Sequence, residues 1–249
     1  MKLFEEAEIS IQEYSTYMFM SPYLNIYAYP QELDYDKIVP RRDDCFAIDA
    51  FARVEPNEGS FNPLPDEFLN RPEGVGLIYF SLGSMGGADI ELMKKITNWF
   101  LESKHKFIVV KGPRGDEYEL KADNIYSGNF LAQPTILPHV DLVITHGGNN
   151  TTTETFYAGK PLIVLPLFAD QYDNGRRVEE CGFGLKLNPY NVTKKQFMSA
   201  IDQVLFDSNI KKRSKDASIR MRNDDRKQHL TIKLEKIAFS NSISINQGS

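Results

Sequence analysis

The stretch DLVITHGGNNTTTETFYAGKPLIVLPLFADQ, residues 141–171, decides the fold. Its uninterrupted apolar run at 142–145 indicates a buried strand, which leads into His146, two glycines and a helix predicted over 149–158. A second apolar run follows at 162–165. Short, continuously apolar strands that alternate with helices are typical of a parallel sheet covered on both faces. The stretch therefore predicts an α/β fold.

The same alternation extends to both sides of this stretch. The further strands that we predict lie at 77–82, 107–110 and 183–187, and the further helices at 89–103, 170–181, 193–206 and 210–238. Asp89 is a good N-cap for the first of these helices, which follows the glycine-rich loop GSMGG. The predicted fold class is thus a Rossmann-like, doubly wound parallel α/β sheet. Ligands bind such sheets beyond the carboxyl ends of the strands, so we look for a site in those loops.

The chain divides into three expected parts, residues 1–75, 76–238 and 239–249. The first part lacks the strand and helix alternation and is punctuated by prolines, which bias the chain toward extended conformations. It holds a possible amphipathic helix between Leu3 and Met18 and the aromatic run SPYLNIYAYPQELDYD. We expect this part to be a connecting segment that wraps onto another domain. The last part, FSNSISINQGS, is expected to be a flexible tail.

Composition and charge exclude several classes of protein. With 41% hydrophobic residues and 25% charged residues the chain is globular, and its net charge of −5 argues against a nucleic-acid partner. The longest apolar stretch, residues 161–169, is far shorter than the roughly 20 residues of a membrane span. The start MKLFEEAEIS has no apolar core of a signal peptide, and the two cysteines suit a reducing compartment. We expect a cytoplasmic protein.

An anion site is outlined where the strand at 142–145 ends. Gly147 and Gly148 allow the backbone to approach a ligand, and the amides of a helix that begins near Asn150 can point at a phosphate. Glu154 follows one turn later, where a carboxylate suits the vicinal hydroxyls of a ribose. The alternative is that His146 and Asn150 merely cap the helix, with Glu154 in its exposed first turn. Taken singly these residues leave both possibilities open, whereas their combination favours the anion site.

Two further groups of polar residues lie outside this stretch or at its end. Asp170 and Gln171 follow the next strand, where they could hydrogen-bond a sugar, although Asp170 could equally be an ordinary N-cap. Asp34 and Asp36 fit a D-x-D metal motif, but they lie in the proline-punctuated segment, away from any strand end. The histidines His105, His139 and His229 have no partner at metal-ligand spacing, so we predict no metal site.

The motifs resemble the nucleotide-binding signature of the UDP-dependent glycosyltransferases, which runs W-x-P-Q, then T-H-x-G-x-N-[GS]-x-x-E, then [DE]-Q. The matching segments are FLAQ at 130–133, THGGNNTTTE at 145–154 and DQ at 170–171, together with the SLGS loop at 81–84. The resemblance covers residues 76 to about 238. It implies the GT-B fold, in which two Rossmann-like domains face each other, and this chain resembles the C-terminal, donor-binding half. The chain looks most like the soluble members of mites and bacteria.

The resemblance also implies a role for each matching residue. Phe130 would stack on uracil, Gln133 would contact the uridine, and Glu154 would hold the ribose hydroxyls. The residues around the diphosphate would be Ser84, His146, Gly148, Asn150 and Thr151, and those that bind the sugar would be Asp170 and Gln171. Phe130 stands where the family usually has Trp, and Ala132 replaces the usual proline. The stacking surface is therefore smaller than is usual.

The implied activity is transfer of a hexose, with glucose expected from Gln171, from a UDP-sugar co-substrate to a hydroxyl of a small lipophilic acceptor. The family inverts the anomeric centre and uses no metal or other cofactor; helix amides and His146 would supply the positive potential. Its general base lies in the N-terminal domain, so that domain is an expected partner and no catalytic residue is predicted here. The alternative is a module that binds UDP or UDP-sugar without catalysing transfer.

Overall fold

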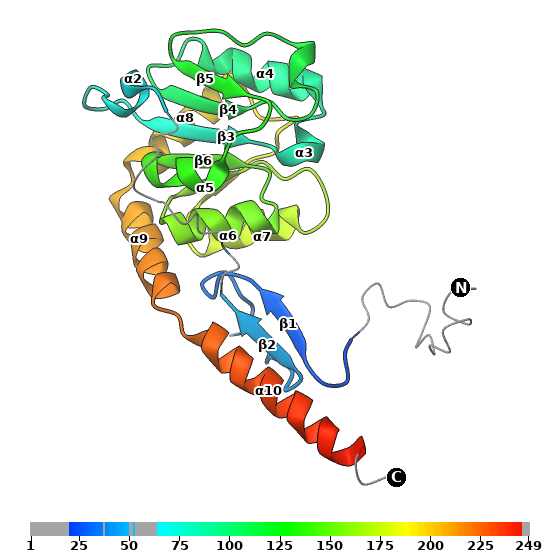
Figure 1. The fold of residues 1–249 in the computed structure, drawn as a ribbon. Coiled ribbons are helices and arrows are strands. Elements are labelled where there is room, and N and C mark those ends of the chain that lie inside the picture. Colours follow the sequence, from blue (N-terminus) through cyan, green and yellow to red (C-terminus); the bar gives the residue numbers. More distant parts are fainter. Residues whose placement is uncertain (1–19, 37, 50–51, 53–63, 246–249) are drawn as a thin grey trace.

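Residues 20–36, 38–49, 52 and 64–245 are described in the computed structural model, with the side chains of 240–245 excepted. The possible helix between Leu3 and Met18 lies outside these residues, as do residues 246–249. Figure 1 shows a layered domain of strands and helices, a two-stranded extension below it, and a long helix at the C-terminal end.

A six-stranded parallel sheet forms the centre of the domain. Its strands are β3 (Leu77–Ser81), β4 (Lys106–Val110), β5 (Ile125–Gly128), β6 (Leu142–Thr145), β7 (Leu162–Val164) and β8 (Gly184–Lys186). The order across the sheet is β5-β4-β3-β6-β7-β8, so the winding reverses between β3 and β6. This is the doubly wound arrangement, and it confirms the predicted fold class.

Helices cover both faces of the sheet. They are α2 (Asp66–Leu69), α3 (Gly83–Gly86), α4 (Ile90–Phe100), α5 (Gln133–Ile136), α6 (Asn149–Ala158), α7 (Gln171–Glu180), α8 (Lys194–Phe206), α9 (Ser208–Arg222) and α10 (Arg226–Ile245). Ile78 and Phe80 of β3 join the core under α4 and α8, whereas Leu77 and Tyr79 join the core on the opposite face. Every residue of β3, β6 and β7 is buried, which explains their continuously apolar sequences.

Local signals in the sequence set the helix ends. The Asp89 side chain accepts a hydrogen bond from the Leu92 amide at the start of α4. Thr193 and Gln196 form a capping box at the start of α8, where each side chain bonds the backbone of the other. Gly159, with φ of +70°, ends α6 in the left-handed conformation that glycine adopts without steric cost.

The structure differs from the sequence predictions in several elements of the domain, among them the short helix α5, which was not predicted. The strand β5 was not predicted, because three of its four residues are only half-buried and its sequence IYSG shows no apolar run. Residues 83–86 form the short helix α3 where we expected a glycine loop. The predicted helix at 210–238 is divided into α9 and α10, and α10 continues past residue 238 to Ile245.

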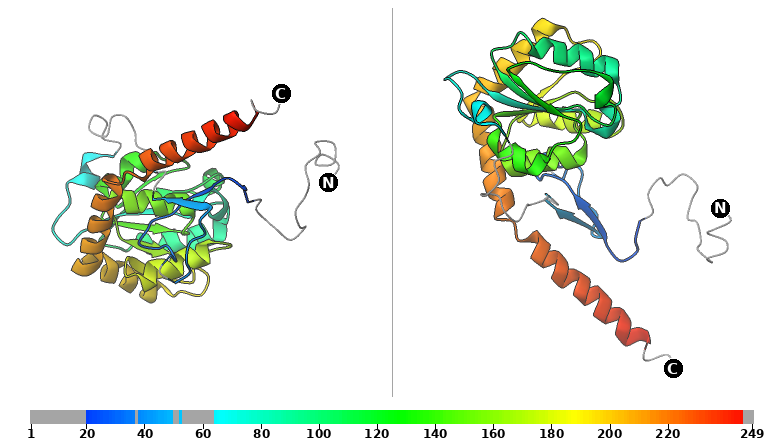
Figure 2. Two further views of the ribbon diagram at one scale, coloured as in Figure 1. Left: turned by 90° about the horizontal axis from the view of Figure 1, so that it is seen from below. Right: turned by 45° about the horizontal axis from the view of Figure 1, so that its top comes forward.

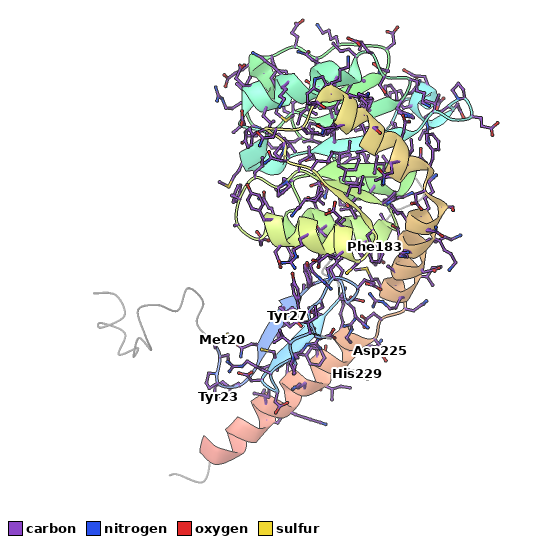
Figure 3. All side chains as sticks on the ribbon, turned by 180° about the vertical axis from the view of Figure 1, so that it is seen from behind. Met20, Tyr23, Tyr27, Phe183, Asp225 and His229 are labelled. Carbon is purple, nitrogen blue, oxygen red and sulfur yellow. The ribbon has the colours of Figure 1, made fainter. Side chains whose placement is uncertain are left out.

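The N-terminal extension, residues 20–36 and 38–49, is named the strap. It contains two short parallel strands, β1 (Asn25–Ala28) and β2 (Cys45–Ile48), which the sequence analysis missed. The strap lies between the domain and α10 (Figures 1 and 2), and β2 contacts α10. Figure 3 shows it from behind, with Met20 and Tyr23 at its outer end and Phe183 on the domain above it.

Buried contacts hold the strap against the domain. Leu33 is fully buried in the core cluster that includes Phe156 and Val164. Asp49 is 2% exposed and forms ion pairs with Arg220 and, at 2.7 Å, with Arg226. A two-stranded sheet is marginal by itself, so these contacts are what fix its place.

Candidate functional site

The candidate site lies where β3 and β6 end, at the point where the strand order reverses. His146 directly follows β6, Ser84 lies in the short helix α3 that follows β3, and α6 begins three residues after His146. Reversal points open a crevice in doubly wound sheets, because neighbouring connections pass to opposite faces. The signature residues that the sequence singled out are therefore placed at the position where this fold binds ligands.

The imidazole of His146 lies between two glycines. A Cβ atom at Gly83 would come within 2.7 Å of its Cε1, and one at Gly148 within 2.5 Å of its Nε2. Burial lowers the pKa of His146, against an opposing effect of the Asp170 carboxylate. The ring is therefore neutral at pH 7 and offers a hydrogen bond rather than the positive charge that we expected of it.

The N-terminus of α6 carries no side-chain cap. Gly148 is the N-cap residue, and the first backbone bond into the helix runs from the Thr152 amide to the Gly148 carbonyl at 3.0 Å. For the amides of Gly148 and of residues 149–151 we find no hydrogen-bond partner among the described residues. His146 and Asn150 are thus not caps, which removes that alternative. Unsatisfied amides at the positive end of a helix dipole form an anion site.

A hydrogen-bond chain through Gln133 joins β3, α5 and α6. The Tyr79 hydroxyl donates to Oε1 of Gln133 at 3.0 Å, and Nε2 of Gln133 donates to Oε2 of Glu154 at 2.5 Å. Glu154 is only 6% exposed, so the alternative of an exposed first turn is wrong. Phe130, three residues before Gln133, is 71% exposed. The structure thus joins a half-buried amide to a buried carboxylate, and leaves the aromatic ring three residues earlier in the chain open to solvent.

At the start of α7, Gln171 is buried and its side chain is already partly hydrogen-bonded. Its Oε1 accepts hydrogen bonds from the amides of Leu167 at 2.9 Å and Phe168 at 3.2 Å. Of its groups, the side-chain NH₂ is therefore the one left to meet a ligand. Asp170 occupies the N-cap position of α7 but makes no capping hydrogen bond. The preceding Ala169 has φ of +51°, a strained conformation of the kind that occurs at binding sites.

The remaining predicted residues surround the end of α6. Ser84 is exposed on α3, Asn150 is exposed in the first turn of α6, and Thr151 is half-buried beside it. Thr151 contributes its carbonyl to the hydroxyl of Thr155, which leaves its amide at the helix end. These residues could contact an anion without loss of an existing hydrogen bond.

Sequence reasoning missed Asn174, which is 4% exposed in α7. Its Nδ2 donates to the carbonyl of Gly147 at 2.8 Å, and its Oδ1 accepts from the hydroxyl of Tyr29 in the strap at 2.8 Å. Its position four residues after Asp170 is the one signal in the sequence that could have drawn attention to it. The loop at 146–148 is therefore bonded to a residue outside the recognised motif.

The two carboxylates of the D-x-D motif in the strap form ion pairs with an arginine side chain. Arg41 lies 3.0 Å from Asp34 and 3.4 Å from Asp36. No group of three or more His, Cys, Asp or Glu side chains in the described part of the chain is placed to hold a metal ion.

None of the helices within the described residues is long and apolar enough to cross a bilayer. A cavity of about 880 Å³ lies beside β5, around Tyr118 and Asn129, and includes none of the signature residues.

Comparison with known proteins identifies a matching family and several proteins of similar sequence. The model of the family "UDP-glucoronosyl and UDP-glucosyl transferase" matches residues 57–225. The chain is 32% identical to human UDP-glucuronosyltransferase 1A1 over 155 residues, which are 60% of this chain and 29% of that protein. It is 27% identical to the sterol 3-beta-glucosyltransferase of Vanderwaltozyma polyspora over 198 residues, 75% of this chain and 16% of that protein.

The fold is also similar to that of solved glycosyltransferases. The crystal structure of the "Glycotransferase of kitacinnamycin" superposes with a TM-score of 0.74 at 20% identity, covering 87% of this chain and 55% of that one. The chain spans less than a third of the length of the two curated relatives. The similarity therefore concerns one part of those proteins.

Proposed function

Because this chain belongs to the UDP-glycosyltransferase family, we propose that it forms the donor-binding part of a hexosyltransferase. The donor is a UDP-sugar, and the acceptor is a hydroxyl of a small lipophilic molecule. The observation that carries this proposal is the uncapped N-terminus of α6, with the buried Glu154 one turn beyond it. That pair of features matches a diphosphate followed by a ribose.

The diphosphate is proposed to bind at the amides of Gly148 and the first turn of α6. Backbone N–H groups and the helix dipole favour an anion there without a metal ion. The ring of His146 lies against Gly148, beside these amides, while Ser84 and Asn150 lie exposed at the rim. We accordingly propose metal-independent donor binding, since Asp34 and Asp36 are paired with Arg41.

The uridine is proposed to occupy the side formed by Phe130, Gln133 and Glu154. A carboxylate can accept as many as about four hydrogen bonds, so Glu154 can hold two ribose hydroxyls and still accept from Gln133. The exposed ring of Phe130 offers its face to the base. Asp170 and the NH₂ of Gln171 then remain for the sugar, which we propose to be glucose.

In the proposed reaction the acceptor oxygen attacks C1 of the sugar as the bond from C1 to the UDP oxygen breaks, which inverts the anomeric centre. The departing UDP carries the negative charge, and the α6 amides with His146 stabilise it. The acceptor proton passes to a general base. We place that base on the N-terminal domain of the family, because residues 1–75 contain no histidine and His146 serves the leaving group.

A second candidate is a module that binds UDP or UDP-sugar without transfer. The absence of a second base in the described site favours it for the chain by itself, because Glu154 and His146 are both assigned to UDP. We also propose a cytoplasmic setting, since glycosylation of the sequons at Asn149 and Asn150 would block the phosphate loop.

Titration calorimetry with UDP, ADP, pyrophosphate and UDP-glucose tests donor binding. We expect UDP to bind more tightly than ADP, and excess EDTA to leave its affinity unchanged. Equal affinity for UDP and ADP would remove the uridine assignment. Stronger competition by UDP-galactose or UDP-glucuronate than by UDP-glucose would overturn the choice of sugar.

Transfer is tested separately with UDP-glucose and a panel of phenolic acceptors, read by mass spectrometry. We expect no glycoside from the chain by itself and glycoside once an N-terminal domain of the family is added. Efficient transfer by the unaided chain, dependent on His146, would contradict the assignment of the base to another domain.

A further inference from the structure

We infer that Asn174 and Tyr29 are positioning residues for the loop at 146–148, which we name the phosphate loop. The strap would then take part in donor binding. The inference rests on the proposed function and extends the donor site beyond the domain that carries the signature. It concerns two hydrogen bonds that link α7, the loop at 146–148 and the strap.

Asn174 fixes the orientation of one peptide group in the loop. Its Nδ2 donates to the Gly147 carbonyl at 2.8 Å. In a trans peptide the C=O and the following N–H point in opposite directions, and the described residues contain no cis peptide bond. The Gly148 amide is therefore turned away from Asn174, and it is one of the amides without a partner among the described residues.

The backbone conformation of Gly147 favours glycine, and glycine is flexible unless a contact restrains it. Its φ is +84°, and a Cβ atom there would lie 2.5 Å from Cγ1 of Val164. A glycine without such a bond can rotate its peptide planes freely. The hydrogen bond from Asn174 removes that freedom before a ligand arrives, which lowers the cost of ordering the loop on binding.

Asn174 also reaches the sugar side of the site. The same Nδ2 lies 3.4 Å from Oδ2 of Asp170, one turn earlier in α7. A single amide group thus connects the phosphate loop with the carboxylate proposed to bind the sugar. No other described residue is bonded to both the 146–148 loop and Asp170.

Tyr29 orients the amide of Asn174 from the strap. Its hydroxyl donates to Oδ1 at 2.8 Å, so that the NH₂ group must face Gly147. Burial raises the pKa of the Tyr29 hydroxyl, with Asp173 adding to the effect, and the group therefore stays a donor throughout the physiological range. The neighbouring Ala28 carbonyl accepts from Nδ2 of Asn149 at 3.0 Å, a second bond from the strap to the start of α6.

Tyr35 provides a matched control in the same strap. Its hydroxyl donates to Oδ1 of Asp173 in α7 at 2.6 Å, so it too holds the strap to that helix. Asp173, however, has no bond to the phosphate loop in the described structure. Tyr29→Phe and Tyr35→Phe each remove one strap hydroxyl, but only the first removes a group that orients Asn174.

The test measures UDP and pyrophosphate affinity by calorimetry for wild type, Tyr29→Phe, Tyr35→Phe and Asn174→Ala. We expect Tyr29→Phe to weaken both ligands about fivefold, because each is held by the phosphate loop, and Asn174→Ala to weaken them more. Tyr35→Phe should leave both affinities unchanged. Equal effects of the two tyrosine variants would show that Tyr29 only docks the strap, and would overturn the inference.

A ligand-free readout separates this inference from the proposed function. The ¹⁵N and ¹H shifts of the Gly148 amide should change in Tyr29→Phe and stay in place in Tyr35→Phe, because only the former frees the peptide plane. If wild type does not bind UDP, the proposed function fails while this measurement still decides the inference. An unmoved Gly148 signal in Tyr29→Phe would refute it, even if UDP binds.

Discussion

The phosphate side and the nucleoside side of the candidate site differ in how their hydrogen-bonding groups are used before a ligand arrives. On the phosphate side, the amides at the start of α6 have no hydrogen-bond partner among the described residues. The ring of His146 lies between Gly83 and Gly148. On the nucleoside side, Gln133 and Glu154 are bonded to each other, and Phe130 is open to solvent.

This difference indicates that an anion can enter a prepared site, whereas a uridine must share bonds that already exist. Prepared amides lose no protein hydrogen bond on binding, and a fixed loop loses little conformational freedom. Glu154, by contrast, accepts from Gln133 at 2.5 Å and must extend its bonding to the ribose. We therefore expect most of the affinity to come from the phosphate side and base discrimination to be the smaller effect.

The largest effect is expected from Gly147→Ala, which attacks the phosphate side. A non-glycine residue at φ of +84° costs about 1–3 kcal/mol in backbone strain. The new Cβ atom would also lie 2.5 Å from Val164, and such overpacking costs a further amount of about 1–3 kcal/mol. Thermal melting should show a strong loss of stability, and calorimetry should show no UDP binding.

Gly74→Ala is the matched control for this change. Gly74 has a similar φ of +79°, but nothing lies within 4 Å of the place where a Cβ atom would be. It should show the backbone cost without the steric clash and should keep its UDP affinity. If both variants bound UDP normally, the loop at Gly147 would not form the phosphate site.

The next largest effect is expected from Glu154→Ala on the nucleoside side. Loss of a charged hydrogen-bond partner costs about 1.5–3 kcal/mol, so UDP affinity should fall by about 10- to 100-fold. Pyrophosphate has no ribose, and its affinity should not change. A parallel loss for both ligands in calorimetry would mean that Glu154 supports the whole site rather than the ribose.

The sequence predicts a helix or strand well where the residues that indicate it follow one another in the chain. The helix at 149–158 was predicted to the residue, because an apolar strand, two glycines and a terminal Gly159 follow one another in the chain. The strands β1 and β5 were missed, since most of their residues are only partly buried and their sequences carry no continuous apolar run. The strand β2 has the apolar sequence CFAI, but it lies in the proline-punctuated segment, where no alternation of strands and helices pointed to it. Burial on one side only leaves a weak pattern in four residues.

The same contrast holds within the candidate site. The residues from His146 to Glu154 form one motif, so the sequence predicts their proximity directly. Asn174 and Tyr29 are 145 residues apart, and only the packing of the strap on α7 brings their side chains together. The bonding of Gln171 to the Leu167 and Phe168 amides was likewise hidden, because a residue type does not reveal which of its groups are already used.

A third, smaller effect concerns the pH dependence of stability through His146. Burial lowers its pKa in the folded state below the ordinary value of 6.5. As pH falls below about 6.5, the unfolded chain binds a proton that the folded chain does not, so the stability of the ligand-free protein falls. The loss levels off once pH passes below the folded pKa.

Thermal melts between pH 7.5 and pH 5.5 measure this contribution when wild type is compared with His146→Gln. The variant keeps a polar side chain but has no titratable ring, so its stability should fall less over the same range. An identical pH profile for both proteins would show that burial does not lower the pKa of His146.

The smallest effect is expected at Phe130, on the nucleoside side. Its ring is 71% exposed, so a larger aromatic ring fits there without disturbing the core. Stacking between a base and an aromatic ring contributes about 1–3 kcal/mol, and Trp offers more surface than Phe, so Phe130→Trp should tighten UDP binding about threefold. Pyrophosphate affinity should stay the same, because pyrophosphate has no base to stack on the ring. Phe239→Trp, at a residue that is 69% exposed on α10, is the matched control and should change neither affinity.

A gain for UDP that is absent for pyrophosphate and for the control would place the base on Phe130. No gain at Phe130 would mean that the uracil lies elsewhere, and the contrast between a prepared phosphate side and an open base side would then rest on Glu154.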